Sequence, residues 1–212
     1  NKIKKVLALS TDKASSPINL YGATKLCADK LFIAANNFKG NKKITFSVLR
    51  YGNVFGSRGS VLEIFLKSKK NNTFKITDKS MTRFNITINE AIELALFSLQ
   101  ISKGEEIIVP KLPSYRVIDL VKAISSKPKI NIIGIRPGEK IHEELIAESN
   151  ALNTVEAKNF YIILKSLSGP IYNYYIKKFK SKRVKKNFSY TSGNNNYFLN
   201  SNNIKKLIGR YN

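Results

Sequence analysis

The chain has 212 residues, 42% of them hydrophobic, and a formal net charge of +23 at pH 7. This length buries a sizeable core in one or two domains, and no apolar run approaches the ~20 residues that cross a bilayer. The single cysteine, Cys27, excludes an internal disulfide and is typical of a reducing cytoplasm. Lysine is spread along the chain, so we interpret the charge as a residue bias and expect no nucleic-acid partner.

The beginning of the chain predicts a strand–helix–strand unit. Apolar and β-branched runs predict strands over residues 3–10 and 44–49, and residues 19–37 have a helical pattern of apolar positions between them. In open α/β sheets the chemistry lies at the carboxyl ends of the strands. We therefore expect an α/β fold that contains the closing half of a doubly wound, Rossmann-type parallel sheet, followed by a small α/β lobe.

The rest of the chain gives weaker patterns. They predict helices over residues 61–69, 89–102, 117–124 and 139–147, and strands over residues 74–77, 106–109, 130–135 and 159–164. Residues 165–187 are poorly specified, and the polar residues 192–196 indicate a turn or loop.

Two polar motifs stand around the first predicted strand and helix. Tyr21 and Lys25 are four residues apart and share one helix face. A tyrosine has a pKa of about 10, and an adjacent ammonium favours the phenolate, so the pair can act as a base. Asp12 and Lys13 follow the strand and can face one cleft if they form a turn. A lysine serves as a base near neutral pH only where its surroundings lower its pKa from about 10.4.

These motifs, with several later ones, resemble the extended short-chain dehydrogenase/reductase superfamily. The matching stretches are residues 10–14, 17–25, 35–40, 50–54, 56–60, 81–84 and 136–140, and more weakly 190–193 and 196–199. More narrowly, the chain is similar to nucleotide-sugar 4,6-dehydratases of the inverting type that act on UDP-N-acetylglucosamine and start pseudaminic acid synthesis. The resemblance implies a cytoplasmic lyase that is a homo-oligomer, with a UDP-sugar substrate and NADP as cofactor, NAD remaining open.

The same resemblance implies roles for particular residues. Thr11 would orient the sugar 4-hydroxyl, Tyr21 with Lys25 would take its proton, Asp12 would be the acid at C6, and Lys13 the base at C5. Tyr21, Lys25 and Tyr51 would contact the cofactor. The residues expected to bind the substrate are Asn53, Arg58, Arg83, Arg136 and Glu139. No metal site is expected, because His142 is the only histidine and has no cysteine beside it.

The glycine pattern bears on the organisation of the chain. No Gly-x-Gly-x-x-Gly follows the first predicted strand, so we expect this chain to be the C-terminal portion of a longer enzyme and to be inactive alone. We assign residues 1–56 to the closing part of a dinucleotide-binding domain with the catalytic residues. Residues 57–150 are expected to form the UDP-sugar lobe, with segments that can return to the sheet, and residues 151–212 a C-terminal extension. Alternatives are a retaining 4,6-dehydratase, a 4-epimerase, or a basic nucleic-acid or surface-binding remnant of the fold.

Overall fold

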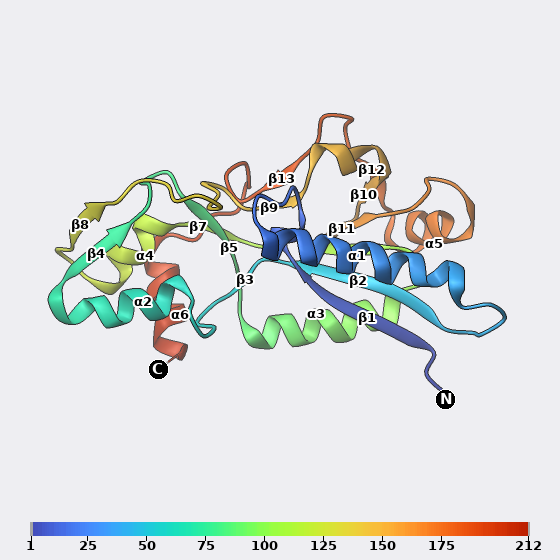
Figure 1. Ribbon diagram of the computed structural model, residues 1–212, viewed down its shortest axis with the longest axis horizontal. Helices are drawn as coiled ribbons and strands as arrows, with labels where there is room; N and C mark the ends of the chain where they lie inside the picture. The colour runs from blue at the N-terminus through green and yellow to red at the C-terminus, as the bar shows by residue number, and fades with distance from the viewer. Residues whose placement is uncertain (1, 212) are drawn as a thin grey trace. The chain divides into compact units, whose positions relative to one another are not determined.

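The computed structural model describes residues 2–211, which fall into two compact units (Figure 1). Unit 1 contains the described residues up to Tyr51 together with Asn89–Lys111 and Glu144–Tyr190. Unit 2 contains Gly52–Ile88, Leu112–Glu143 and the described residues from Thr191 onward. The boundaries expected near residues 56 and 150 divide the chain into three consecutive segments. In the structure, each unit takes residues from early, middle and late parts of the chain.

Unit 1 is built on a six-stranded sheet with the order β1-β2-β6-β11-β10-β12. Strands β1 (Lys5–Thr11), β2 (Thr45–Tyr51) and β6 (Ile107–Pro110) are parallel. The sequence predicts parallel strands for β1 and β2, whereas it assigns the strand at β6 to the segment of the lobe. Antiparallel strands continue the sheet: β11 (Phe160–Ile163), β10 (Thr154–Glu156) and β12 (Lys182–Arg183). The register aligns Thr11 with Tyr51, so the carboxyl ends of β1 and β2 lie side by side.

Helices cover both faces of this sheet, which is the doubly wound arrangement. On one face lies α1 (Leu20–Phe38), whose Asp29 pairs with Arg50 of β2 and whose Asn36 side chain bonds the Phe46 backbone. On the other face, Leu49 and Ile108 pack against α3 (Ile88–Ile101) and α5 (Gly169–Phe179). Tyr175 of α5 is fully buried in this cluster. Two short strands, β9 (Glu144–Ile146) and β13 (Tyr190–Thr191), form a separate pair.

Unit 2 holds two small sheets and three helices. Strands β3 (Asn53–Val54), β5 (Thr82–Ile86) and β7 (Ser114–Arg116) form one sheet, and β4 (Thr73–Ile76) pairs in parallel with β8 (Lys129–Ile132). Helices α2 (Val61–Ser68), α4 (Val117–Ile124) and α6 (Ser201–Tyr211) complete it. Their apolar residues share one core with those of the strands, including Phe65, Phe74, Leu120 and Ile204.

The segment after the Arg-Pro-Gly-Glu motif is extended, so the helix predicted over residues 139–147 is wrong. Its backbone groups bond to other parts of the chain: Ile141 O accepts from Thr82 N, and Glu143 O accepts from Ser192 N. In a helix these carbonyls would bond within the segment. Tertiary pairing therefore outweighs local helix propensity here.

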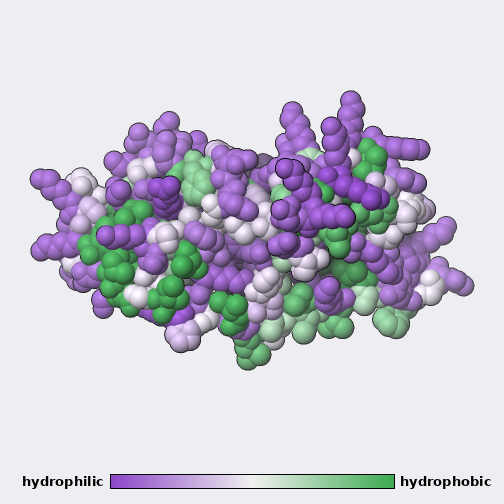
Figure 2. Space-filling view, turned by 90° about the horizontal axis from the view of Figure 1, so that it is seen from above, coloured by the Kyte–Doolittle hydropathy of each residue, from purple (hydrophilic) through white to green (hydrophobic). Residues whose placement is uncertain are grey.

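The surface is mostly hydrophilic, with hydrophobic areas between the polar side chains (Figure 2). Exposed apolar side chains occur on α1, such as Leu31 and Phe38, and on α3, such as Ile92. None of the helices in residues 2–211 combines the length and the apolar character that crossing a bilayer requires.

Candidate functional site

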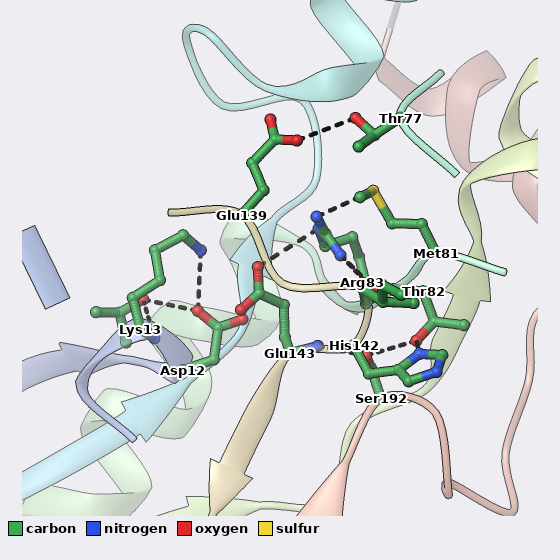
Figure 3. A network of polar contacts seen from close by, with 12 residues as sticks. Asp12, Lys13, Thr77, Met81, Thr82, Arg83, Glu139, His142, Glu143 and Ser192 are labelled. Carbon is green, nitrogen blue, oxygen red and sulfur yellow. Dashed lines mark hydrogen bonds and ion pairs between the residues drawn. The ribbon is translucent and has the colours of Figure 1, made fainter. Parts of the chain in front are cut away.

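The carboxyl end of β1 turns at once into a single 3₁₀ turn, η1 (Asp12–Ala14). Thr11 caps this turn, because its hydroxyl accepts a hydrogen bond from Lys13 N at 3.3 Å and donates to Asp12 Oδ1 at 2.9 Å. Lys13 Nζ donates to the same Asp12 oxygen at 3.0 Å (Figure 3). The turn therefore brings the predicted acid Asp12 and the predicted base Lys13 together, and the Thr11 hydroxyl forms a hydrogen bond with each of these residues.

Asp12 is a fully buried acid in this turn. Its side chain is 0% exposed, whereas that of Lys13 is 34% exposed. Asp12 Oδ1 accepts two hydrogen bonds, but Oδ2 is buried and has no hydrogen-bond partner among the described residues. A buried carboxyl oxygen without a donor is costly, so Oδ2 is open to a hydrogen bond from a ligand. Oδ2 is therefore the Asp12 atom that can contact a bound substrate.

Helix α1 begins directly against this turn. Asn19 caps the helix by accepting from Gly22 N at 2.8 Å. A Cβ on Gly22 would overlap the carbonyl oxygen of Lys13 and lie 3.0 Å from Pro17 Cβ. Gly22 is therefore required for the close approach of α1 to the Asp12–Lys13 turn.

Tyr21 and Lys25 occupy the first turns of α1, as the spacing predicted. Tyr21 is 57% exposed, so its hydroxyl is accessible. Lys25 Nζ donates to Leu9 O of β1 at 3.1 Å, which directs the ammonium toward the sheet. An ammonium has three donors, so two remain for a ligand. Tyr51 ends β2 next to Thr11, is half-buried, and burial raises the pKa of its hydroxyl.

Unit 2 contains a cavity of about 490 Å³, within the usual range for small-molecule sites. Four of the five predicted substrate-binding residues line it: Asn53, Arg83, Arg136 and Glu139. Apolar residues contribute part of the remaining wall, among them Phe65, Met81 and Ile133. The fifth predicted residue, Arg58, is exposed in the loop before α2 and is not part of this lining.

A tight turn presents two of these residues to the cavity. Glu139 N donates to Arg136 O at 3.1 Å, and Gly138 has a φ of +81°. Proline followed by a glycine with positive φ is the signature of a type II turn. Thr77 Oγ1 donates to Glu139 Oε2 at 3.1 Å and so fixes the carboxylate. The turn thus places one guanidinium and one oriented carboxylate at the same cavity.

Arg83 reaches the cavity from β5 and is held by several partners. Its Nη1 donates to Thr82 O at 2.6 Å and to Ile141 O at 3.1 Å, and its Nε lies 3.5 Å from Glu143 Oε1. Nη2 contacts Met81 Sδ at 3.1 Å. The guanidinium is thereby fixed at the cavity wall with most of its donors used, and its positive charge is its main contribution there.

The sequence reasoning missed several residues that complete these arrangements. Thr77 and Lys75 line the cavity, Glu143 pairs with Arg83, and Ser192 bonds the Glu143 backbone. A signal was present only for Glu143, a carboxylate that follows the Arg-Pro-Gly-Glu motif by four residues. His142 is exposed and bonds Thr82, and no group of three or more metal-ligating residues occurs within residues 2–211.

The parallel sheet, the Tyr21–Lys25 pair on α1 and the Asp12–Lys13 turn are those of the extended short-chain dehydrogenase/reductase class. Comparison with known families is more specific. The chain belongs to the polysaccharide biosynthesis protein family, which it matches over residues 1–165.

Individual relatives agree with this assignment. The chain is 44% identical to a Campylobacter jejuni UDP-N-acetylglucosamine 4,6-dehydratase (inverting), over 98% of this chain and 64% of that protein. It is 39% identical to a Rickettsia bellii UDP-glucose 4-epimerase, over 77% of this chain and 49% of the relative. The crystal structure of Pen from Bacillus thuringiensis is similar with a TM-score of 0.81 and 36% identity, over 99% of this chain and 63% of that one. The chain thus spans less than two thirds of the length of these proteins.

Proposed function

We propose that this chain is the catalytic and substrate-binding part of a UDP-N-acetylglucosamine 4,6-dehydratase that inverts C5 and recycles its NADP internally. The observation that carries the proposal is the η1 turn, where buried Asp12 and partly exposed Lys13 share a 3.0 Å hydrogen bond. Removal of water from a sugar needs one acid and one base at adjacent carbons. The Campylobacter relative, 44% identical, is named for this reaction.

The proposed reaction begins at the sugar C4. Tyr21, with Lys25 one helical turn away, takes the proton of the 4-hydroxyl. A nicotinamide cofactor, held by Lys25 and Tyr51, would supply the hydride acceptor for C4 and the hydride donor for C6. The resulting C4 ketone acidifies the proton at C5, and Lys13, as the neutral amine, removes that proton. Asp12 gives a proton to the departing 6-hydroxyl, which leaves as water, and a proton then returns to C5 on the opposite face.

Two features of unit 1 support a nicotinamide dinucleotide as the cofactor. Lys25 keeps two of its three ammonium donors for ribose hydroxyls after bonding Leu9 O, and the Tyr21 hydroxyl one helical turn away is accessible. We assign Tyr51 to the same partner, since its half-buried ring ends β2 beside Thr11. The reaction, as proposed, takes place in the cytoplasm.

The cavity of unit 2 supports a nucleoside diphosphate as the ligand. Arg83, Arg136 and Lys75 line it and supply positive charge for the phosphates, and guanidinium groups suit phosphate oxygens. Glu139, oriented by Thr77, can accept hydrogen bonds from ribose hydroxyls. Apolar wall residues suit the flat face of a base. We assign Arg58 no direct contact.

A 4-epimerase is the second candidate, since the Rickettsia relative, 39% identical, is named UDP-glucose 4-epimerase. An epimerase needs the Tyr21–Lys25 pair but has no use for an acid and a base at C5 and C6. Buried Asp12 therefore favours the dehydratase.

The test uses the complete protein that contains this chain, incubated with UDP-N-acetylglucosamine and followed by NMR. A 4-keto-6-deoxy sugar inverted at C5 is expected; a 4-epimer without loss of water would refute the proposal, and retention at C5 would refute inversion. Tyr21→Phe is expected to lower kcat by at least about 100-fold at the C4 step, in line with the loss of a general base. Lys13→Ala is expected to stop water loss while C4 oxidation continues. Lys30→Ala, an exposed lysine on α1, is the matched control.

A further inference from the structure

In unit 2, the side chains of Ser192, Thr82 and His142, which have no role in the reaction proposed above, form a series of hydrogen bonds that we call the relay. Thr82 Oγ1 lies 2.8 Å from His142 Nδ1 and 2.7 Å from Ser192 Oγ, and Ser192 Oγ accepts from Glu143 N at 2.9 Å (Figure 3). Thr82 is 3% exposed and Ser192 is 0% exposed. Ser192 lies in the late segment of the chain, beyond residue 165, where the family match ends.

The direction of these hydrogen bonds follows from counting protons. Ser192 Oγ already accepts from Glu143 N, so its own proton is best used by donating to Thr82 Oγ1. Thr82 then donates to His142 Nδ1, and both hydroxyls give and receive a hydrogen bond. This order requires His142 Nδ1 to be the acceptor and Nε2 to carry the proton. The opposite order leaves the buried Ser192 proton with no acceptor in this relay, which is costly.

The relay ends beside the arginine of the cavity. Ser192 makes two hydrogen bonds with the backbone of Glu143: its Oγ accepts from Glu143 N, and its N donates to Glu143 O at 2.7 Å. Glu143 in turn faces Arg83 Nε, and Thr82 O accepts from Arg83 Nη1. A shift of Ser192 or Thr82 would therefore move two partners of the Arg83 guanidinium together.

The His142 ring has a fixed place in this arrangement. A Cβ on Gly193 would lie 2.6 Å from His142 Cγ and 2.8 Å from Nδ1, so the ring packs on the Gly193 backbone. Only glycine at this position lets the ring approach Thr82. The late segment thus contributes two residues: Gly193 packs against the His142 ring, and Ser192 bonds Thr82 at the start of β5.

We propose that Ser192, Thr82 and His142 are positioning residues that hold Arg83 at the cavity wall for the diphosphate of a nucleotide ligand. This inference rests on the proposed function, which places a nucleoside diphosphate in the cavity. The late segment is then a working part of the nucleotide site, through contacts that never touch the ligand.

The first experiment compares binding of UDP and of uridine by calorimetry, because only UDP carries the phosphates that Arg83 would meet. Ser192→Ala and His142→Gln are expected to weaken UDP binding about tenfold, because the Arg83 guanidinium loses its fixed position, and to change uridine binding less than about twofold. His142→Asn places an acceptor near the Nδ1 position and is expected to keep most of the affinity. The control is Gly209→Ala, since nothing lies within 4 Å of that position. Equal losses for UDP and uridine, or no loss for UDP, would overturn the inference.

The second experiment does not depend on any ligand. His142 is the only histidine, so nitrogen NMR of the imidazole reports on this ring alone. The unliganded protein is expected to show Nε2 protonated and Nδ1 as an acceptor, and Thr82→Val is expected to change the Nδ1 signal and that of Arg83 Nε. A proton on Nδ1 in the neutral ring would overturn the relay. If the wild-type protein binds no UDP while these signals are as expected, the proposed function fails and the relay stands without its ligand role.

Discussion

Arg50 and Asp29 form a buried ion pair in unit 1. Arg50 of β2 donates to Asp29 Oδ2 through Nε at 3.3 Å and through Nη2 at 2.9 Å, and its Nη1 donates to Leu145 O at 3.1 Å. Both side chains of the pair are at most 3% exposed. A pair of this kind fixes α1 to the sheet, and its cost appears when one partner is removed.

Asp29→Ala is therefore expected to lower the free energy of unfolding by about 4 kcal/mol, because the Arg50 charge stays buried without its partner. Urea unfolding followed by circular dichroism measures the change. The control is Lys67→Ala, which breaks the exposed Lys67–Glu63 pair, where Lys67 is 75% exposed. That loss is expected to stay below about 1 kcal/mol. Similar effects for the two variants would contradict this account.

At the scale of elements, the approach of α1 to the η1 turn decides where the predicted base lies relative to Tyr21. Gly22 allows this approach, since a Cβ there would overlap Lys13 O. Glycine in a helix normally lowers stability by about 1 kcal/mol relative to alanine. Its presence at Gly22 indicates that close packing outweighs this loss.

Gly22→Ala is expected to destabilise the protein and to slow water loss more than C4 oxidation, because the added methyl group displaces the Lys13 backbone. Gly209→Ala in α6 meets nothing within 4 Å and is expected to gain up to about 1 kcal/mol from better helix propensity. Unfolding curves and the rates of the two half-reactions measure both variants. A stabilised Gly22→Ala protein with normal water loss would show that the approach has no role.

A second contact between elements predicts a pH effect. Glu106 precedes β6, is fully buried, and accepts hydrogen bonds from Ser47 of β2 and Tyr175 of α5. Burial raises the pKa of the Glu106 carboxyl, although hydrogen bonds from Lys103 N and Tyr175 oppose the shift. The native state then binds the proton at a higher pH than the unfolded chain, whose carboxyl has a pKa of about 4.3. The free energy of unfolding therefore falls as the pH rises through the native pKa.

Glu106→Gln removes this titration and keeps an acceptor for Ser47 and Tyr175. We expect its unfolding free energy to depend less on pH than that of the wild type above the pH at which the unfolded carboxyl titrates. Urea unfolding at several pH values measures the slope. Glu93→Gln, at an exposed position of α3, should leave the wild-type slope unchanged. A slope unaffected by the Glu106 change would mean that another group titrates.

The sequence predicted the elements whose pattern is local. The apolar runs predicted β1 and β2, and the helical periodicity over residues 19–37 predicted α1. Strand β5, with the sequence Thr-Arg-Phe-Asn-Ile, was missed because its polar residues are buried only through partners elsewhere in the chain. The late helices α5 and α6 were missed because the segment that contains them is rich in lysine and asparagine.

The candidate site divides in the same way. Asp12, Lys13, Tyr21 and Lys25 lie within fourteen residues, so the predicted strand end and helix, together with the family resemblance, predicted their grouping. The Thr82–Ser192 contact joins residues 110 positions apart, and the Thr82–His142 contact spans 60. Such pairs depend on the tertiary fold, and no local sequence pattern predicts them.

For the whole molecule, the net charge of +23 makes nucleic-acid binding the alternative to the proposed function. The salt dependence of binding distinguishes the two. A nucleotide held by a few cavity groups releases few counterions, so UDP binding is expected to weaken less than about tenfold between 50 and 200 mM salt. A protein that contacts six or more phosphates would lose about 1,000-fold over the same range. Titrations with UDP and with a random oligonucleotide at both salt concentrations measure this. Tight oligonucleotide binding with the steep salt dependence, and none of UDP, would favour the alternative.

Each unit is assembled from three separate segments of the chain, and this affects how the protein can fold during translation. Unit 1 gains α5 with its buried Tyr175 only after residue 169, and unit 2 gains α6 with its buried Ile204 only after residue 201. Domains whose pieces are contiguous can fold one after another as they leave the ribosome. Here each hydrophobic interior is complete only after translation has passed these helices, so we expect apolar surface of the nascent chain to stay exposed for longer than in two tandem domains of contiguous segments.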